Sequence, residues 1–426
     1  MNNLATSHDV AKAIASALAD ERMRRHRQEL TPPDSTEEKR LAREAAAQYL
    51  RSRQSAHSWG LEQDASHDEE LIDEAVAHVL GLGKLQPLLE DPEISDIHIR
   101  GNKPVWLKMR SGERREHPPI VSTDAELVDL IRRIATRMGH REQRFDAAHP
   151  ELNLQMKDGS RLFATMEVSS HPTLVIRRHR FEFSSLGELV HHNMMTPHTA
   201  QFLAAAVRAR YNIVIAGGTG TGKTTLLRAL INEIPRLERI VTIEDAFEIG
   251  LEHFESAHPD HDALQSRPAN TEGLGEITMA DLARMALRMD PDRVIVGEVR
   301  GGEAFPMLLA MSQGNNGSMC TIHADSARTV FPKLLAYVSL ADLSLPSEAI
   351  NLLVSTAIHF VVHIHIVNGV RQIVSIHEVV DADGVAISSN EVFSSTQQHQ
   401  SFIALRSETA GCLEAFGFQP PRELVW

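Results

Sequence analysis

The middle of the chain alternates between short apolar runs and longer stretches with apolar residues at helical spacing. The apolar runs predict buried strands at 213–216, 240–243, 294–296 and 319–323. Strands that alternate with helices form mostly parallel sheets. We therefore predict that residues 185–365 form an α/β domain.

The region before it has a different order of elements. The pattern predicts helices at 70–80 and 124–138, and strands at 94–98, 105–109, 152–156, 162–168 and 174–178. Helices and strands that do not alternate regularly are typical of an α+β domain.

The two ends of the chain differ from both domains. The first 70 residues are rich in Ala, Arg and Glu and predict helices at 8–30 and 36–53, the first ending before Pro32 and Pro33. Residues 55–68 are polar and predict a linker, and a strand is expected at 372–376 in the tail. The expected domains are a helical extension at 1–70, an α+β domain at 71–184, the α/β domain at 185–365, and a small β-rich element at 366–426.

Composition narrows the class of protein. The 426 residues carry a net charge of −14, which argues against general electrostatic binding of nucleic acid, so no direct nucleic-acid contact is expected. Cys320 and Cys412 are the only cysteines, which indicates a reducing compartment. The first residues lack a signal-peptide pattern, and no run of about 18 apolar residues exists. We expect a cytosolic protein that reaches a membrane only through partners.

A glycine-rich segment follows the first strand of the α/β domain. Residues 217–225 read Gly-Gly-Thr-Gly-Thr-Gly-Lys-Thr-Thr and fit the phosphate-binding P-loop pattern, with a strand before and a helix after. Lys223 is expected to reach the β- and γ-phosphates of ATP, and the Thr224 hydroxyl to bind Mg²⁺. The expected nucleotide-binding residues are Gly218, Thr219, Gly220, Thr221, Gly222, Lys223, Thr224 and Thr225.

Polar residues follow three further strands. Glu244 and Asp245 come after one, Glu298 after the next and His323 after the last. The carboxyl ends of parallel strands lie at the edge of the sheet that carries the P-loop. A single acid at a strand end is usually a solvated loop charge, but two such sites downstream of one P-loop favour roles in binding Mg²⁺ and orienting water.

These runs resemble the motifs of a known family. Thr242-Ile243-Glu244-Asp245, the run from Arg293 to Ala304, and the run from Gly317 to Ala324 resemble the Asp box, Walker B and His box of the secretion traffic ATPases, in the right order. These proteins power type II and type IV secretion, type IV pili and tight-adherence (Flp) pili. The resemblance covers about 70–380, is closest to the tight-adherence branch, and implies a RecA-like P-loop NTPase core.

The resemblance implies a role for each residue of the site. Glu298 positions the attacking water, Glu244 and Asp245 help hold Mg²⁺, and His323 contacts the γ-phosphate region. Arg177 is expected to act as an arginine clamp on the phosphates.

Other arginines are weaker candidates. Arg161 and Arg144 are possible additional clamps, and Arg300 is placed to brace Glu298. For Arg177, Arg161 and Arg144, the alternative role is that of an ordinary salt bridge. Gly297 stands where many P-loop enzymes have Asp, so Mg²⁺ depends on Thr224 and the Asp box.

The resemblance also implies an assembly and a cellular role. Family members form homohexamers, bind an inner-membrane platform protein, and associate peripherally with the cytoplasmic face of that membrane. We expect an ATPase that powers export of pilin or another substrate, with a hinge at 184–187. Two alternatives remain open: a motor for DNA transfer or uptake, and a nucleotide-dependent regulatory switch.

Overall fold

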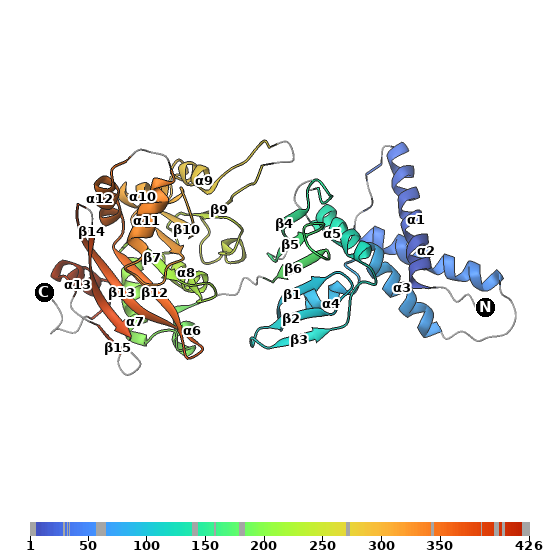
Figure 1. Cartoon of the computed structure of the whole chain (residues 1–426), viewed down its shortest axis with the longest axis horizontal. Helices are drawn as coiled ribbons and strands as arrows, with labels where there is room; N and C mark the ends of the chain where they lie inside the picture. The colour runs from blue at the N-terminus through green and yellow to red at the C-terminus, as the bar shows by residue number, and fades with distance from the viewer. Residues whose placement is uncertain are drawn as a thin grey trace. The chain divides into compact units, whose positions relative to one another are not determined.

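A computed structural model of the chain divides into two compact units, Met1–Arg180 and Phe181–Trp426 (Figure 1). The structure describes residues 6–28, 30–31, 33, 35–56, 65–138, 144–156, 159–178, 184–269, 273–341, 345–384, 386–395, 400–402 and 405–419. Among these residues, no helix is both long and apolar enough to cross a membrane.

Three helices open the first unit: α1 (Ser7–Arg27), α2 (Ser35–Ala56) and α3 (Ala65–Leu80). They share a small core that includes Val10, Ile14 and Ala46. Helix α1 ends earlier than predicted, and α2 and α3 take in both ends of the predicted linker. Residues 57–64 of that linker lie outside the described residues. The boundary expected at residue 70 falls inside α3, because α3 packs on α1 and α2.

The rest of the first unit is an antiparallel sheet that packs one face on helices. Its strand order is β3-β2-β1-β6-β5-β4. Its elements are α4 (Leu85–Glu90), β1 (Ile94–Arg100), β2 (Val105–Met109), β3 (Arg114–His117), α5 (Asp124–Met138), β4 (Glu151–Gln155), β5 (Arg161–Thr165) and β6 (Thr173–Arg177). Alternate residues such as Ile97 and Ile176 are buried in one core with Ile131 of α5.

Two strands of this sheet depart from the sequence prediction. Strand β3 was missed because its residues are polar and mostly exposed, so the sequence has no apolar alternation there. Strand β5 ends at Thr165, before the predicted end at 168. Glu167 has a φ of 61°, a left-handed conformation that a strand cannot continue through.

The second unit is built on one nine-stranded sheet of order β15-β14-β13-β12-β7-β11-β10-β8-β9. The run from β9 to β12 is parallel, and β12 to β15 are antiparallel. The strands are β7 (Ile213–Gly217), β8 (Ile240–Glu244), β9 (His261–Gln265), β10 (Arg293–Val299), β11 (Met319–Ile322), β12 (Phe360–Val367), β13 (Val370–Asp383), β14 (Ala386–Ser395) and β15 (Gln400–Phe402). The C-terminal strands therefore extend the core sheet, where a separate β-rich element at 366–426 was expected.

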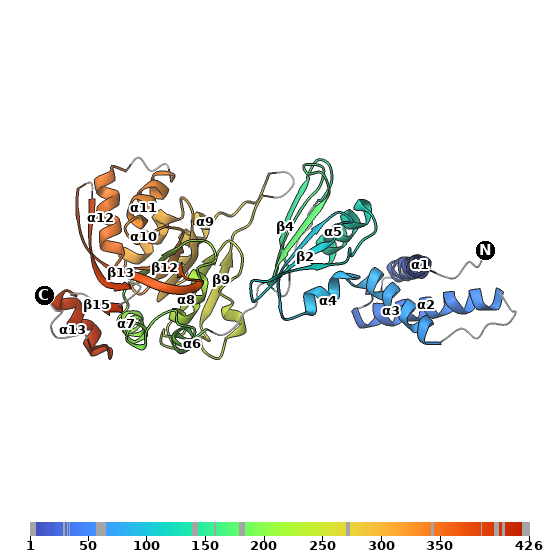
Figure 2. The same ribbon diagram turned by 60° about the horizontal axis from the view of Figure 1, so that its bottom comes forward.

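Helices cover both faces of this sheet (Figure 2). They are α6 (Leu186–His191), α7 (Pro197–Arg208), α8 (Lys223–Ile231), the 3₁₀ turn η1 (Leu251–His253), α9 (Met279–Ala286), α10 (Ala304–Ser312), α11 (Val330–Ser339), α12 (Ser347–Ala357) and α13 (Ser407–Ala415). Ile213 and Ile215 of β7 point into the core shared with α6, α7, α8 and α13. Val214 and Ala216 point into the core shared with α9 to α12. This two-sided burial explains the unbroken apolar runs that predicted the strands.

The segment expected to act as a hinge, 184–187, leads into helix α6. Ser185 caps the helix in a capping box with Glu188. The Asn232 side chain donates a hydrogen bond to the Ser184 carbonyl. Capping satisfies the free N–H groups of the helix start, so the helix has a well-defined first turn at these residues.

Two buried polar side chains, Asn212 and Arg293, join neighbouring backbone segments at the edge of the sheet where the parallel strands begin. Asn212 donates to the carbonyls of Met311 (2.9 Å) and Ala357 (2.6 Å) and accepts from the N–H groups of Gly317 and Ser318.

Arg293 has no exposed surface and pairs with Glu238, with 2.7 Å between Nε and Oε2. Its Nη1 donates to the Val207 carbonyl at 2.7 Å. Both buried side chains are hydrogen-bonded, as a low-dielectric interior requires.

Candidate functional site

The P-loop joins the end of β7 to the start of α8, as the sequence predicts. Gly220 (φ 74°) and Gly222 (φ 96°) adopt left-handed conformations that favour glycine. Gly217 is needed for space, because a Cβ there would lie 2.7 Å from the Ile364 carbonyl oxygen of β12. The loop therefore delivers the first N–H groups of α8 to one edge of the sheet, an arrangement that binds anions.

Lys223 is the first residue of α8 and is 8% exposed. Its ammonium donates to the Gly218 carbonyl across the loop at 3.0 Å. Burial lowers the pKa of Lys223, and the nearby carboxylate of Glu298 opposes that shift. A buried cation that folds back over backbone N–H groups is the arrangement expected of a polyphosphate site.

Thr224 faces a carboxylate that the sequence analysis did not single out. Its hydroxyl lies 3.4 Å from Oε2 of Glu248, in the loop after β8. Only the folded path of that loop brings Glu248 to the P-loop. The sequence offered one weak signal, a further acid four residues after Glu244.

Glu244 lies at the end of β8, as predicted, but its side chain is buried in the protein. Its side chain is 2% exposed, and it accepts hydrogen bonds from the Thr242 hydroxyl (2.9 Å) and the N–H groups of Glu248 (2.7 Å) and Ile249 (2.8 Å). Burial raises its pKa to about 7, although these hydrogen bonds oppose the shift. Both oxygens are engaged by the protein, so Glu244 holds the loop that carries Glu248. The expectation that Glu244 itself ligates Mg²⁺ does not fit this environment.

Glu298 lies between two basic side chains at the end of β10. Its Oε1 is 2.6 Å from Nε2 of His323, and its Oε2 accepts from Nε of Arg300 at 2.7 Å and from a second guanidinium nitrogen. Arg300 therefore braces Glu298, as the sequence suggested. The preceding residue, Gly297, lies beside Glu244, where a Cβ would be 3.4 Å from Cγ of Glu244, an ordinary contact distance.

His323 and Asp245 complete this cluster. Burial lowers the pKa of His323, and the charge of Lys223 adds to that shift, so the ring is neutral near pH 7. Its Nε2 is close to Oε1 of Glu298, but among the described residues that buried oxygen has no hydrogen-bond partner. Asp245 lies 3.4 Å from Nη1 of Arg300 and accepts from the Ser266 hydroxyl at 2.9 Å.

The predicted clamp arginines lie in the first unit. Nε of Arg177 pairs with Asp96 at 3.1 Å, and the Arg177 side chain is 66% exposed. Asp96 is 6% exposed. Burial raises its pKa, but the Ser95 hydroxyl, Arg177 and Lys108 together bring the net pKa below its usual value.

The other two arginines differ in their position. Arg161 lies directly opposite Arg177 in the sheet, so both side chains belong to the same face. Arg144 precedes β4 and is exposed. Within the second unit, the structure brings the remaining predicted residues together around the P-loop.

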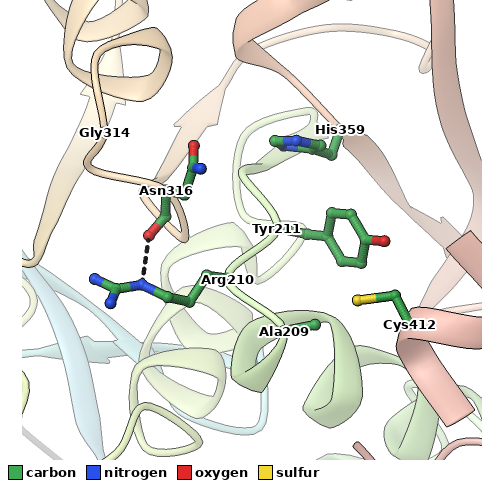
Figure 3. A pocket seen from close by; sticks show the side chains of 7 residues that line it. All are labelled: Ala209, Arg210, Tyr211, Gly314, Asn316, His359 and Cys412. Atoms are coloured by element: carbon green, nitrogen blue, oxygen red, sulfur yellow. Dashed lines mark hydrogen bonds between the residues drawn. The ribbon is translucent and has the colours of Figure 1, made fainter. Parts of the chain in front are cut away.

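A separate pocket of about 480 Å³ lies at the opposite edge of the same sheet, where β7 and β12 begin. Its lining includes Arg210, Tyr211, His359 and Cys412 (Figure 3). None of its lining residues belongs to the P-loop cluster, and no carboxylate lines it. The nucleotide-site residues therefore lie at the other end of the parallel strands.

Comparison with known proteins agrees with this geometry. The model of the family described as type II/IV secretion system protein matches residues 90–408. The chain belongs to this family. Family members are ATPases that hydrolyse nucleoside triphosphates, and this chain is an enzyme of that class.

Two relatives show the level of similarity within this family. A putative conjugal transfer protein of Mycobacterium tuberculosis is 33% identical over 293 residues, covering 67% of this chain and 80% of the relative. The type IV secretion system protein VirB11 of Brucella suis is 30% identical over 332 residues, covering 71% of this chain and 89% of the relative.

Solved structures of ATPases share the fold. The Legionella pneumophila ATPase DotB has a TM-score of 0.51 at 20% identity and covers 71% of this chain and 80% of its own. The pilus retraction motor PilT, solved with ADP, has a TM-score of 0.51 at 17% identity and covers 74% of this chain and 84% of its own. These structures consist of an N-terminal domain and a P-loop ATPase core, which confirms the predicted fold class.

Proposed function

We propose that this ATPase is the motor of a pilus or secretion machine, working at the cytoplasmic face of the inner membrane. The observation that carries the proposal is the geometry around Glu298. One carboxylate beside the P-loop is contacted at both oxygens, by the His323 ring close to Oε1 and by Arg300, which donates to Oε2. A site that only binds nucleotide has no need of a carboxylate oriented in this way, whereas hydrolysis requires one.

The proposed reaction is attack of water on the γ-phosphorus of ATP. Glu298 orients the water and accepts its proton, while the bond between the γ-phosphorus and the β–γ bridging oxygen breaks to release ADP. Lys223 and the N–H groups of the P-loop stabilise the charge on the phosphate oxygens. His323 and Arg300 keep Glu298 in the orientation that lets it act.

The oxygen groups at Thr224 and Glu248 fit a magnesium ion, which prefers hard oxygen ligands. We propose that these two residues face Mg²⁺, with Asp245 close enough to bind its water shell. When bound, Mg²⁺ neutralises charge on the β- and γ-phosphates. Glu244 contributes by accepting the Glu248 N–H and so fixing the position of that residue.

We extend the proposal to the assembly that the family resemblance implies. Six copies would form a ring, and Arg177, with Arg161 beside it, would reach the phosphates when nucleotide is bound. Through its contacts with these arginines, ATP would favour the form in which they reach the phosphates, and hydrolysis would end that preference. The movement would pass to a platform protein in the membrane, with the tight-adherence machinery as the proposed setting.

A DNA-transfer motor is the second candidate, because one relative carries the description of a putative conjugal transfer protein. The net charge of −14 argues against direct contact with DNA but leaves open a role in driving its transport through other components. The regulatory-switch alternative is disfavoured by the pairing of Glu298 with His323, which a switch does not need.

The two motor roles are separated by one experiment in the native host. Glu298→Gln is introduced on the chromosome, the protein level is confirmed, and surface fibres and DNA transfer are scored in parallel. We expect fibres to disappear while DNA transfer continues. Loss of DNA transfer alone would replace the pilus proposal with the DNA-transfer candidate, and no change in either would refute both.

A further inference from the structure

The outer side of the P-loop is held by a residue far away in the sequence. Strands β12 and β13 form a hairpin whose turn contains Asn368 (φ 51°) and Gly369 (φ 81°), the conformations of a tight type I′ turn. Arg371 follows this turn, and its Nε donates a hydrogen bond to the Gly220 carbonyl at 3.0 Å. The hairpin therefore delivers a cation to the middle of the loop.

A second contact lies beside the first. A Cβ on Gly222 would lie 3.0 Å from Cε of Met194 and 3.3 Å from Cδ of Arg371, so these two side chains form a wall against the loop. The N–H of Ile373, two residues after Arg371, donates to the Met194 carbonyl at 2.9 Å. Met194 is 4% exposed, so the wall is anchored in the core.

The hydrogen bond from Arg371 determines how one peptide of the loop is oriented. In a trans peptide, the carbonyl oxygen and the following N–H point in opposite directions. When Arg371 holds the Gly220 carbonyl toward the hairpin, the N–H of Thr221 must point away from it, to the inner side of the loop. Glycine at 220 leaves this peptide free to rotate unless something fixes it.

We propose that Arg371 is a positioning residue for nucleotide binding, which keeps the P-loop peptide at Gly220–Thr221 in the orientation that binds phosphate. It acts through the loop and does not touch the reacting atoms. This inference rests on the proposed nucleotide site and adds the β12–β13 hairpin to it. The hairpin joins strands β13 to β15 to the rest of the core sheet. These C-terminal strands are therefore connected directly to the nucleotide site.

The test compares ADP binding by the wild-type chain, Arg371→Gln, Arg371→Lys and a matched control. Arg236→Gln is that control, since Nε of Arg236 also donates to a backbone carbonyl, that of Ser256, at 3.0 Å. Titration calorimetry with ADP gives the affinity, and thermal unfolding with and without ADP gives an independent reading.

We expect both Arg371 variants to bind ADP about tenfold more weakly or worse, because each loses a charged hydrogen bond to the loop. Their unfolding temperature without ADP should match that of Arg236→Gln. Adding ADP should raise their unfolding temperature by less than it raises that of the wild type. At saturating ATP their turnover should fall by a smaller factor than their affinity for ADP, so the larger change falls on KM. If Arg371→Gln also unfolds at a lower temperature without ADP, Arg371→Lys, which keeps the charge and the aliphatic stem, carries the test.

Three results would count against these claims. If Arg371→Gln binds ADP as the wild type does, Arg371 does not position the loop. If Arg371→Lys restores full affinity, the charge alone matters and the positioning role is refuted. If the wild-type chain itself fails to bind ADP, the proposed nucleotide site is refuted, an outcome distinct from the other two.

Discussion

The imidazole Nε2 of His323 lies 2.6 Å from Oε1 of Glu298. Glu298 belongs to β10, and His323 directly follows β11, the parallel strand next to it. Since burial and the charge of Lys223 lower the pKa of His323, the ring is neutral at physiological pH while it lies against the carboxylate. The pair thus fixes the carboxylate that we propose orients water. The same contact makes the site sensitive to acid, because a protonated ring adds positive charge beside Lys223.

Replacing His323 tests this contact. His323→Ala should lower ATP turnover by about tenfold or more, since the close contact that helps to orient Glu298 is lost. His323→Gln keeps an N–H donor and should retain more activity than the alanine variant. In pH–rate profiles, the wild type should be flat between pH 7 and 8.5 and fall below pH 6.5, and His323→Gln should fall at lower pH. Equal activity of the alanine variant and the wild type would contradict the role given to this pair.

Glu244 predicts a pH dependence of stability. Its pKa is raised from 4.5 to about 7 by burial, so the folded chain favours the protonated form. Its contribution to stability is complete below pH 4.5 and is lost as the pH rises through 7. The loss amounts to about 3 kcal/mol, the free-energy equivalent of the shift.

Glu244→Gln removes this titration. Relative to the wild type, the unfolding temperature of Glu244→Gln should therefore rise as the pH increases from 5 to 8.5. Glu252→Gln, at an exposed position, serves as the control and should show no such trend. A constant difference between Glu244→Gln and the wild type across this range would show that burial does not control the carboxyl group.

Replacing Arg293 should greatly lower the free energy of unfolding. Arg293→Met leaves Glu238 with only its longer contact to Arg210, 3.6 Å between Nη2 and Oε2, and removes the hydrogen bond to the Val207 carbonyl. We therefore expect a loss of about 3 kcal/mol in urea unfolding. Adding Glu238→Gln to this variant should recover part of the loss. Arg284→Met, whose side chain is 66% exposed, should change stability by less than about 1 kcal/mol. A similar effect at both positions would mean that the buried pair is not important.

The sequence predicted the parts of this fold that rest on local pattern. The strand, loop and helix around Lys223 were predicted because glycine spacing and apolar runs are both local signals. The same holds for β8, which ends at Glu244, and for β10, which contains Glu298 and is longer than expected. Strand β9 was missed because it lies at the edge of the sheet, where its residues are only partly buried.

Long-range contacts account for what the sequence did not reveal. Arg371 reaches Gly220 from 151 positions along the chain, and no spacing rule signals that contact. Glu248 lies close to Thr224, and buried Glu244 holds the loop after β8 by accepting the Glu248 N–H. For the same reason, the sequence suggested a separate C-terminal element where β13 to β15 continue the core sheet, since strand pairing is decided by register and packing.

The most direct test of the account is phosphate release by purified Glu298→Gln measured together with ATP binding. The account predicts that ATP binds with wild-type affinity while phosphate release falls by about a hundredfold or more. Lys223→Ala should lose binding as well as turnover, which separates the two functions. Phosphate release at the wild-type rate from Glu298→Gln, with ATP bound normally, would contradict the central claim that this carboxylate activates the water.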